Sequence, residues 1–199
     1  MILWKIKKID GIDVFKSCFE TDKYKFNLWN KIYLSSVCKK AIKILKDGYY
    51  PKANDLLLFF AIAYCATSYQ GIDSPPYYNY CFGLGSTGSS TLTLEKFQTY
   101  CYEANAAKYL MSLSNTIHLE NLSTNIILKL KYKLLDECIW NWNENLPKDL
   151  SQKGLDILLS TWGREDTITG MARKLHNNSK QIAEKIIDYP GLKIRKSKI

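Results

Sequence analysis

The amino-acid sequence predicts an all-α fold, a compact bundle of about six or seven helices with little or no sheet. Apolar residues recur at helical spacing through most of the 199-residue chain. Proline and glycine are gathered between those stretches, where they end helices. Residues 56–67 are apolar on every side, which is typical of a helix buried at the centre of a fold.

The first half of the chain contains two predicted helices. Residues 2–20 fit either a short pair of strands or an irregular lead-in. Apolar residues then follow the helical period over 24–46, with Asp22 as the expected N-cap. The central helix follows at 56–67, and we expect its segment 56–66 to be the most buried part of the protein.

The second half continues the helical pattern. The expected helices run from Thr91 or Thr93 to Leu113, and over residues 123–142, 151–162, 166–175 and 179–189. Pro147 and Gly163 separate three of them. We expect a helical core over residues 1–149 and a C-terminal three-helix segment over 150–199, packed together as one domain.

The cysteines favour a reduced, intracellular protein. They are Cys18, Cys38, Cys65, Cys81, Cys101 and Cys138, scattered one to an element and without Cys-x-x-Cys spacing. This spacing is typical of core thiols rather than of disulfides or a zinc site. We therefore expect a cytoplasmic location, no metal and no cofactor. The longest apolar run is shorter than the roughly 20 residues that span a bilayer, so no membrane partner is expected.

The net charge of +9 is unevenly distributed. Residues 1–53 carry 12 basic and 5 acidic side chains and residues 164–199 carry 9 and 4, whereas the middle carries 7 and 10. Two basic ends indicate either a surface for DNA, RNA or an acidic protein, or a lysine-rich composition without functional meaning. Only three of the 28 basic residues are arginine, the side chain best suited to reading bases, so low sequence specificity is expected.

The C-terminal segment 168–187 has the apolar spacing of a helix-turn-helix, with residues 176–178 as its turn. In such a motif the start of the second helix faces the DNA groove. Any pair of short helices can imitate this spacing, and His176 stands where the turn usually has glycine. The candidate nucleic-acid-binding residues, including a basic tail, are Arg173, Lys174, Ser179, Lys180, Gln181, Lys193, Arg195, Lys196 and Lys198.

The loop at 74–90 interrupts the helical pattern with prolines, tyrosines, glycines and hydroxyl groups. Its segment 83–88 has Gly-x-Gly-x-x-Gly spacing, but no strand–helix–strand unit surrounds it, which argues against a dinucleotide site. Free backbone amides before the next helix would suit an anion. The candidate loop or pocket residues are Tyr77, Tyr78, Asn79, Gly83, Gly85, Ser86 and Thr87.

Residues 66–71 and 79–84, followed by Phe97 and Tyr100, resemble glucosaminidases of the lysozyme-like helical fold. The resemblance implies a cleft under the loop and a catalytic glutamate at the end of the buried helix. Thr67 stands at that position, and threonine cannot protonate a glycosidic oxygen. The resemblance therefore implies a degenerate enzyme rather than an active hydrolase. The nearest carboxylates, which do not match the family's position, are Asp73, Glu95 and Glu103.

These observations favour an intracellular nucleic-acid-binding protein of low sequence specificity that acts through basic helical surfaces. The alternatives are an enzyme or degenerate enzyme of lysozyme-like helical type with its cleft at the 74–90 loop, and a protein-interaction module. No catalytic set can be assigned from the sequence, because no nucleophile, base and acid occur in a recognisable pattern.

Overall fold

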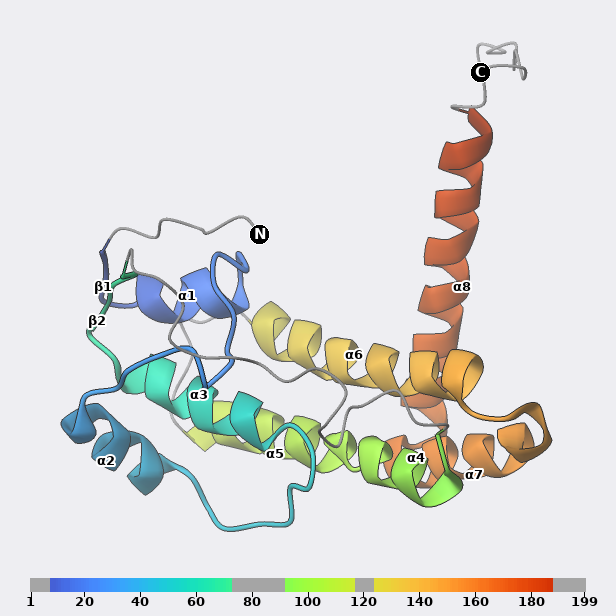
Figure 1. Cartoon of the computed structure of the whole chain (residues 1–199), viewed down its shortest axis with the longest axis horizontal. Helices are drawn as coiled ribbons and strands as arrows, with labels where there is room; N and C mark the ends of the chain where they lie inside the picture. The colour runs from blue at the N-terminus through green and yellow to red at the C-terminus, as the bar shows by residue number, and fades with distance from the viewer. Residues whose placement is uncertain (1–7, 73–91, 117–123, 188–199) are drawn as a thin grey trace.

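The computed structural model describes residues 8–72, 92–116 and 124–187, and it confirms the all-α class (Figure 1). The helices are α1 (Asp13–Phe19), α2 (Ser35–Ile44), α3 (Asn54–Cys65), α4 (Leu94–Cys101), α5 (Glu103–Thr116), α6 (Thr124–Trp140), α7 (Ser151–Trp162) and α8 (Arg164–Ile187). In this described part the strands are β1 (Ile9–Asp10) and β2 (Ser68–Tyr69), which pair antiparallel with Ile9 opposite Tyr69.

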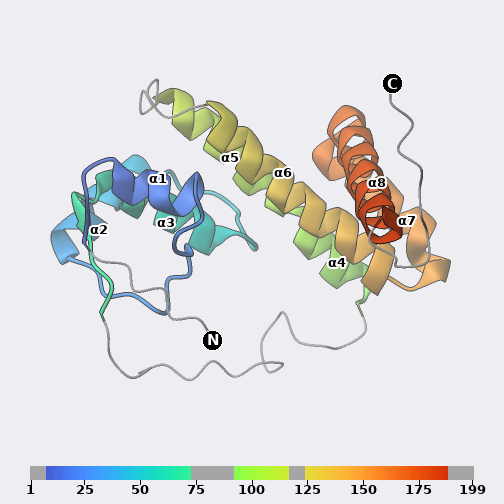
Figure 2. The same cartoon turned by 90° about the horizontal axis from the view of Figure 1, so that it is seen from above.

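Helices α5 and α6 lie side by side and antiparallel, and they form the spine of the molecule (Figure 2). Helices α1, α2 and α3 gather at one end of this pair, and α4 and α7 lie at the other. Helix α8 stands away from the rest, so that its C-terminal half projects beyond the other helices (Figure 1). The main hydrophobic core extends from Phe15 of α1 to Trp162 of α7, and a smaller cluster lies between α2 and α3.

The predicted central helix is confirmed as α3, and it is buried on nearly all sides. Phe60, at its middle, is fully buried. Its ring meets Phe15 edge-on at a centroid distance of 4.8 Å and Phe19 at 5.4 Å. Edge-to-face rings of this kind add to the free energy gained from burying apolar area. The N-terminal helices are therefore organised around the aromatic side chains of α1 and α3.

Helix α1 was not expected, because residues 2–20 gave a choice of strand pair or irregular lead-in. The structure has one short strand, β1, and then a seven-residue helix whose Val14, Phe15, Cys18 and Phe19 are buried. A helix this short is marginal by itself and draws its stability from tertiary packing. Two turns are also too few to establish a helical period in the sequence.

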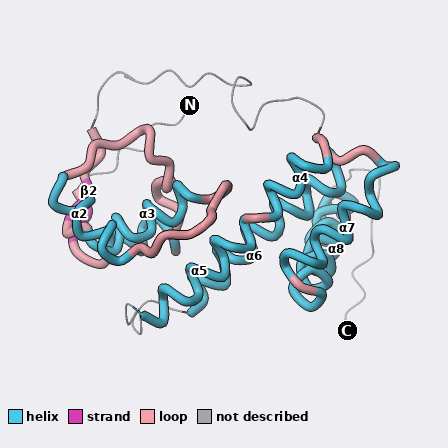
Figure 3. Tube along the Cα trace, turned by 90° about the horizontal axis from the view of Figure 1, so that it is seen from below, coloured by secondary structure: helices cyan, strands magenta, loops and turns pink. Residues whose placement is uncertain are grey.

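The predicted helix over residues 24–46 is wrong in its first half, since α2 begins only at Ser35. Tyr24 stacks on Tyr69 of β2 at 4.1 Å, and its hydroxyl donates a hydrogen bond to the Val14 carbonyl. These contacts hold the chain in a loop where the apolar period favoured a helix (Figure 3). Asp22 is not an N-cap, because α2 begins at Ser35 and its N-cap position is Leu34. Asp22 instead adopts a left-handed φ of 53° in the loop.

The remaining breaks between helices follow local chemistry. The Thr93 side chain caps α4 by accepting a hydrogen bond from the Lys96 amide at 3.3 Å. Of the two starts expected from the sequence, Thr91 and Thr93, the structure has the second. The expected helix from there to Leu113 is divided at Tyr102 into α4 and α5. Helix α6 ends in a π-helical turn, η2 (Asn141–Asn145), and Pro147 then prevents its continuation.

The predicted helix-turn-helix is wrong, because α8 is a single helix from Arg164 to Ile187. Residues 176–178, the expected turn, have helical backbone, and the Ser179 hydroxyl donates to the Leu175 carbonyl at 2.9 Å across them. No proline or glycine occurs between Met171 and Ile187 to interrupt the helix. Polar residues alone do not end a helix when backbone bonding can continue.

Two glycines position α8 against the spine. Gly163 has a φ of +85°, which lets the chain turn sharply between α7 and α8. At Gly170 a Cβ atom would lie 2.7 Å from Ile139 Cδ1 and 2.9 Å from Leu135 Cδ2, so a larger residue there would require these α6 side chains to shift. Among the described residues, no helix has the length and apolar character needed to cross a bilayer.

Candidate nucleic-acid interface

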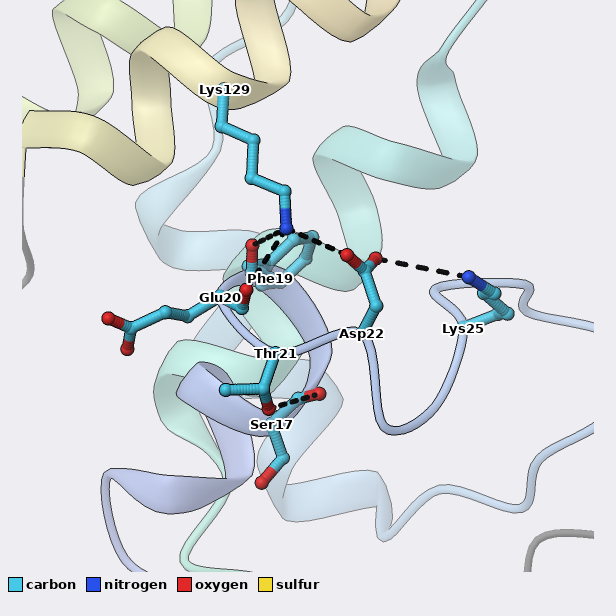
Figure 4. A network of polar contacts seen from close by, with 7 residues as sticks. All are labelled: Ser17, Phe19, Glu20, Thr21, Asp22, Lys25 and Lys129. Atoms are coloured by element: carbon cyan, nitrogen blue, oxygen red, sulfur yellow. Dashed lines mark hydrogen bonds and ion pairs between the residues drawn. The ribbon is translucent and has the colours of Figure 1, made fainter. Parts of the chain in front are cut away.

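The Lys129 side chain of α6 closes the end of α1 (Figure 4). Its Nζ donates to the Glu20 carbonyl at 3.0 Å and to the Asp22 carboxylate at 2.7 Å, and it lies 3.4 Å from the Phe19 carbonyl. The last carbonyls of a helix lack partners within the helix and carry partial negative charge. An ammonium group at this position therefore stabilises α1 and joins it to α6.

Asp22 is the carboxylate around which the neighbouring lysines gather. The hydrogen bond from Lys129, together with the charges of Lys129, Lys25 and Lys133, holds the pKa of Asp22 below its usual range. The Lys25 ammonium lies 3.9 Å from the same carboxylate, as an exposed ion pair (Figure 4). Asp22 is therefore ionised at neutral pH, and it offsets part of the positive charge around it.

Two more lysines lie against aromatic rings. The Lys133 ammonium is 5.2 Å from the centroid of Phe26, and the Lys31 ammonium is 5.0 Å from that of Phe59. Lys31 also donates to the Asn27 carbonyl at 2.6 Å. Burial lowers the pKa of Lys31 to about 8, because removing water disfavours the charged form.

We name Lys25, Lys31, Lys129 and Lys133 the lysine cluster. It joins the loop after α1 to the outer side of α6. From Lys23 to Lys46 the sequence has seven lysines and no carboxylate, so nothing within that segment neutralises them. Trp29, which is 45% exposed, presents an aromatic surface in the same loop. A positive surface interleaved with aromatic rings is the arrangement that binds single-stranded nucleic acid.

The sequence predicts a helix over residues 24–46, lysines included, and does not connect these lysines to α6. Lys129 and Lys133 are four residues apart, and this spacing places both on one side of α6. Lys131, between them, faces the other way and bonds to Asp166 of α8 at 2.6 Å. The spacing was available from the sequence, but the contact with the loop after α1 depends on tertiary structure.

The candidate residues on α8 are differently placed. The Arg173 guanidinium lies 4.0 Å from the Tyr132 ring centroid and 3.6 Å from the Asp136 carboxylate, so it is held against α6. Lys174 is half-buried. Burial raises the pKa of Asp136, and the charges of Arg173 and Lys174 partly oppose this. Ser179 uses its hydroxyl within the helix. These side chains do not form a continuous basic surface with the lysine cluster.

Several candidate residues lie outside the described part of the chain. The backbone of Lys180 and Gln181 belongs to α8, but their side chains are not described. The tail residues Lys193, Arg195, Lys196 and Lys198 are likewise outside it, as are the loop residues Tyr77, Tyr78, Asn79, Gly83, Gly85, Ser86 and Thr87. Their roles remain predictions.

Among the described residues, the carboxyl group with the largest pKa shift is that of Glu103, the first residue of α5. It is 4% exposed, and burial together with the charge of Glu137 raises its pKa to about 8. The Sγ of Cys138 lies 3.7 Å from Glu103 Oε2 and 3.5 Å from the Tyr100 carbonyl. Glu103 is therefore protonated at neutral pH, as a buried carboxyl without a cationic hydrogen-bond partner should be.

This buried group does not form a recognisable catalytic site. A hydrogen bond with Cys101 and burial raise the pKa of Cys138, so its thiol does not ionise to become a nucleophile. Burial likewise raises the pKa of Cys18 to about 12. All five cysteines in the described part are free thiols, and that part contains no group of three His, Cys, Asp or Glu residues that could hold a metal ion.

Comparison of the chain with protein-family models, with curated proteins and with solved structures finds no match. Thr67, where the glucosaminidase resemblance places a catalytic glutamate, follows α3 directly. Its carbonyl accepts a hydrogen bond from the Gly11 amide at 2.8 Å, which ties the end of α3 to β1.

Proposed function

We propose that this protein binds nucleic acid with low sequence specificity through the lysine cluster and the loop that carries Trp29. The observation that carries the proposal is the gathering of four lysines from the loop after α1 and from α6. Two of them, Lys25 and Lys129, pair with Asp22, and the other two lie over aromatic rings. Lys25 and Lys133 are exposed, so their charges are available to phosphate groups. Neutralising phosphates releases counterions, which supplies the free energy of non-specific binding.

The kind of charge in the cluster supports low specificity. Its basic members are all lysine, a flexible point charge, whereas base recognition in the major groove relies mainly on the rigid fork of arginine. The contacts that position Lys129 and Lys31 are also internal to the protein. The cluster therefore suits a phosphate backbone better than base edges.

Binding should favour single strands, because Trp29 can stack on an unpaired base. We expect labelled single-stranded DNA and RNA of mixed sequence to bind at low ionic strength, with affinities that vary little between sequences, in a fluorescence anisotropy titration. Base stacking on an aromatic ring contributes about 1–3 kcal/mol, so Trp29→Ala should weaken single-strand binding by roughly fivefold or more. Trp140→Ala is the matched control, since Trp140 is similarly exposed on the far end of α6.

The pH dependence adds a second signature. Because the pKa of Lys31 is about 8, the cluster loses one positive charge as the pH rises through that value. Binding should therefore weaken between neutral pH and about pH 9, a range in which ordinary lysines stay charged. Absence of binding to every probe at low ionic strength, or equal weakening by both tryptophan substitutions, contradicts the proposal.

The basic tail is a second expected contact region. Removing residues 193–199 should reduce the salt dependence of binding without unfolding the protein, because α8 ends at Ile187. Unchanged salt dependence after this truncation would limit the interface to the lysine cluster.

A further inference from the structure

Helix α2 and the segment that leads into it expose aliphatic side chains among lysines. Ile42 of α2 is 62% exposed, and Ile32 and Leu34, in the segment that leads into the helix, are 92% and 73% exposed. The inner side of α2 packs on α3, with Ala41 fully buried there. We name Ile32, Leu34 and Ile42, together with the exposed Lys39, Lys40, Lys43 and Lys46, the α2 surface.

Helix α2 lies at the edge of the molecule, next to loops, and α3 is the helix it packs against (Figure 3). Exposing an aliphatic side chain to water is unfavourable. Three such side chains close together in the sequence indicate a surface that a binding partner covers. Nucleic acid does not account for them, because phosphates are polar and unpaired bases stack on flat aromatic or guanidinium groups, which Ile32 and Leu34 do not have. The occupant must accept both apolar and positively charged groups.

We infer that the α2 surface docks on an anionic lipid membrane. A bilayer interface takes aliphatic side chains into its acyl boundary, while anionic headgroups attract the surrounding lysines. The segment from Lys23 to Lys46 is basic and has no carboxylate that would repel anionic headgroups. A purely basic segment suits a uniformly anionic surface better than a protein surface of mixed charge. This contact is peripheral, so it requires no membrane-spanning helix.

The test is sedimentation of the full chain with vesicles of phosphatidylcholine mixed with phosphatidylserine, compared with vesicles of phosphatidylcholine alone. We expect binding to the anionic vesicles only, at low salt. Replacing Ile32 and Leu34 by serine should weaken binding by roughly tenfold or more, because each substitution removes the free energy of transferring an apolar side chain from water into the membrane. Replacing Lys39 and Lys43 by glutamine should weaken it roughly fivefold for each lysine.

Matched controls separate this inference from the proposed function. Ile168→Ser removes an aliphatic side chain that is 53% exposed on α8, and it should leave vesicle binding unchanged. The Ile32→Ser, Leu34→Ser double variant should retain wild-type affinity for single-stranded DNA, whereas Lys133→Gln should not. Because every substituted side chain is exposed, a wild-type melting temperature is expected and is checked first.

Three results would overturn the inference. One is failure of the wild-type chain to bind the anionic vesicles at low salt. Another is vesicle binding that survives the Ile32→Ser, Leu34→Ser double substitution, which would place the contact elsewhere. The third is concentration-dependent self-association that the same double substitution abolishes, since this would assign the surface to a second copy of the chain.

Discussion

The lysine cluster and the Glu103 site place ionisable groups beside aromatic or sulfur-containing side chains in opposite environments. At the cluster, the side chains of Lys25 and Lys133 are exposed to solvent. At the other site, Glu103 is enclosed by Cys138, Tyr100 and their neighbours, and burial raises its pKa to about 8. Lys31 lies between these extremes, with a pKa lowered to about 8 but an ammonium group still charged at neutral pH.

The difference shows that burial decides whether a charge contributes to function or to folding. A buried group without a partner becomes neutral, because desolvation outweighs the available Coulomb energy. A perturbed pKa often marks a functional site, but Glu103 faces the core rather than an opening. The exposed lysines of the cluster can meet a ligand directly. We therefore propose the lysine cluster, rather than Glu103, as the functional site.

The largest expected effect tests the core that supports both regions. Phe60→Ala should lower the free energy of unfolding by about 3–5 kcal/mol, because it leaves a cavity among aromatic rings. Chemical denaturation monitored by circular dichroism measures this change. Leu175→Ala, at an exposed apolar position on α8, should change stability by less than about 0.5 kcal/mol. Equal effects of the two substitutions would contradict the position of α3 at the centre.

The second effect concerns Glu103, and its sign is set by the raised pKa. The folded protein holds this proton up to about pH 8, whereas an ordinary glutamate loses it near 4.5. Its stabilising contribution is therefore complete below pH 4.5 and is lost as pH rises to about 8, by at most about 1.4 kcal/mol per pH unit. Glu103→Gln should match the wild type at acid pH and exceed its stability above pH 8. Parallel stability–pH curves for the two proteins would show that Glu103 titrates normally.

A smaller effect is expected at the helix end that the cluster closes. Lys129→Gln removes the charge that bonds to the Glu20 carbonyl and to Asp22, so stability should fall by about 1 kcal/mol. Lys25→Gln removes only an exposed ion pair and should change stability by less than about 0.5 kcal/mol. Thermal unfolding of both variants checks the difference. If Lys25→Gln were the more destabilising, the capping role of Lys129 would be wrong.

The sequence predicted the fold class and the central helix because the apolar run of α3 is long and uninterrupted. It also predicted α7 closely, since Gly163 marks its end. It failed where tertiary contacts override local pattern. Tyr24 is held by Tyr69 and Val14 rather than by a helix, and α1 is too short for its period to be recognised.

The candidate site was predicted only in part. The charge distribution showed a basic N-terminal region, which includes the lysines of residues 23–46. Their neighbours Lys129 and Lys133 belong to α6, about 100 residues later in the sequence. No local pattern connects two segments that distant, because their contact depends on how α1 packs against α6. The helix-turn-helix was an error of the opposite kind, in which local spacing suggested a turn that continuous backbone bonding excludes.

The salt dependence of single-strand binding tests the central claim most directly. Each phosphate contact that is lost should reduce the slope of log affinity against log salt by about 0.7. The double variant Lys25→Gln, Lys133→Gln should therefore bind with a slope smaller by about 1.4. The matched double variant Lys148→Gln, Lys153→Gln, just before and within α7, should retain the wild-type slope. A slope that the first pair leaves unchanged would contradict the assignment of the lysine cluster as the nucleic-acid interface.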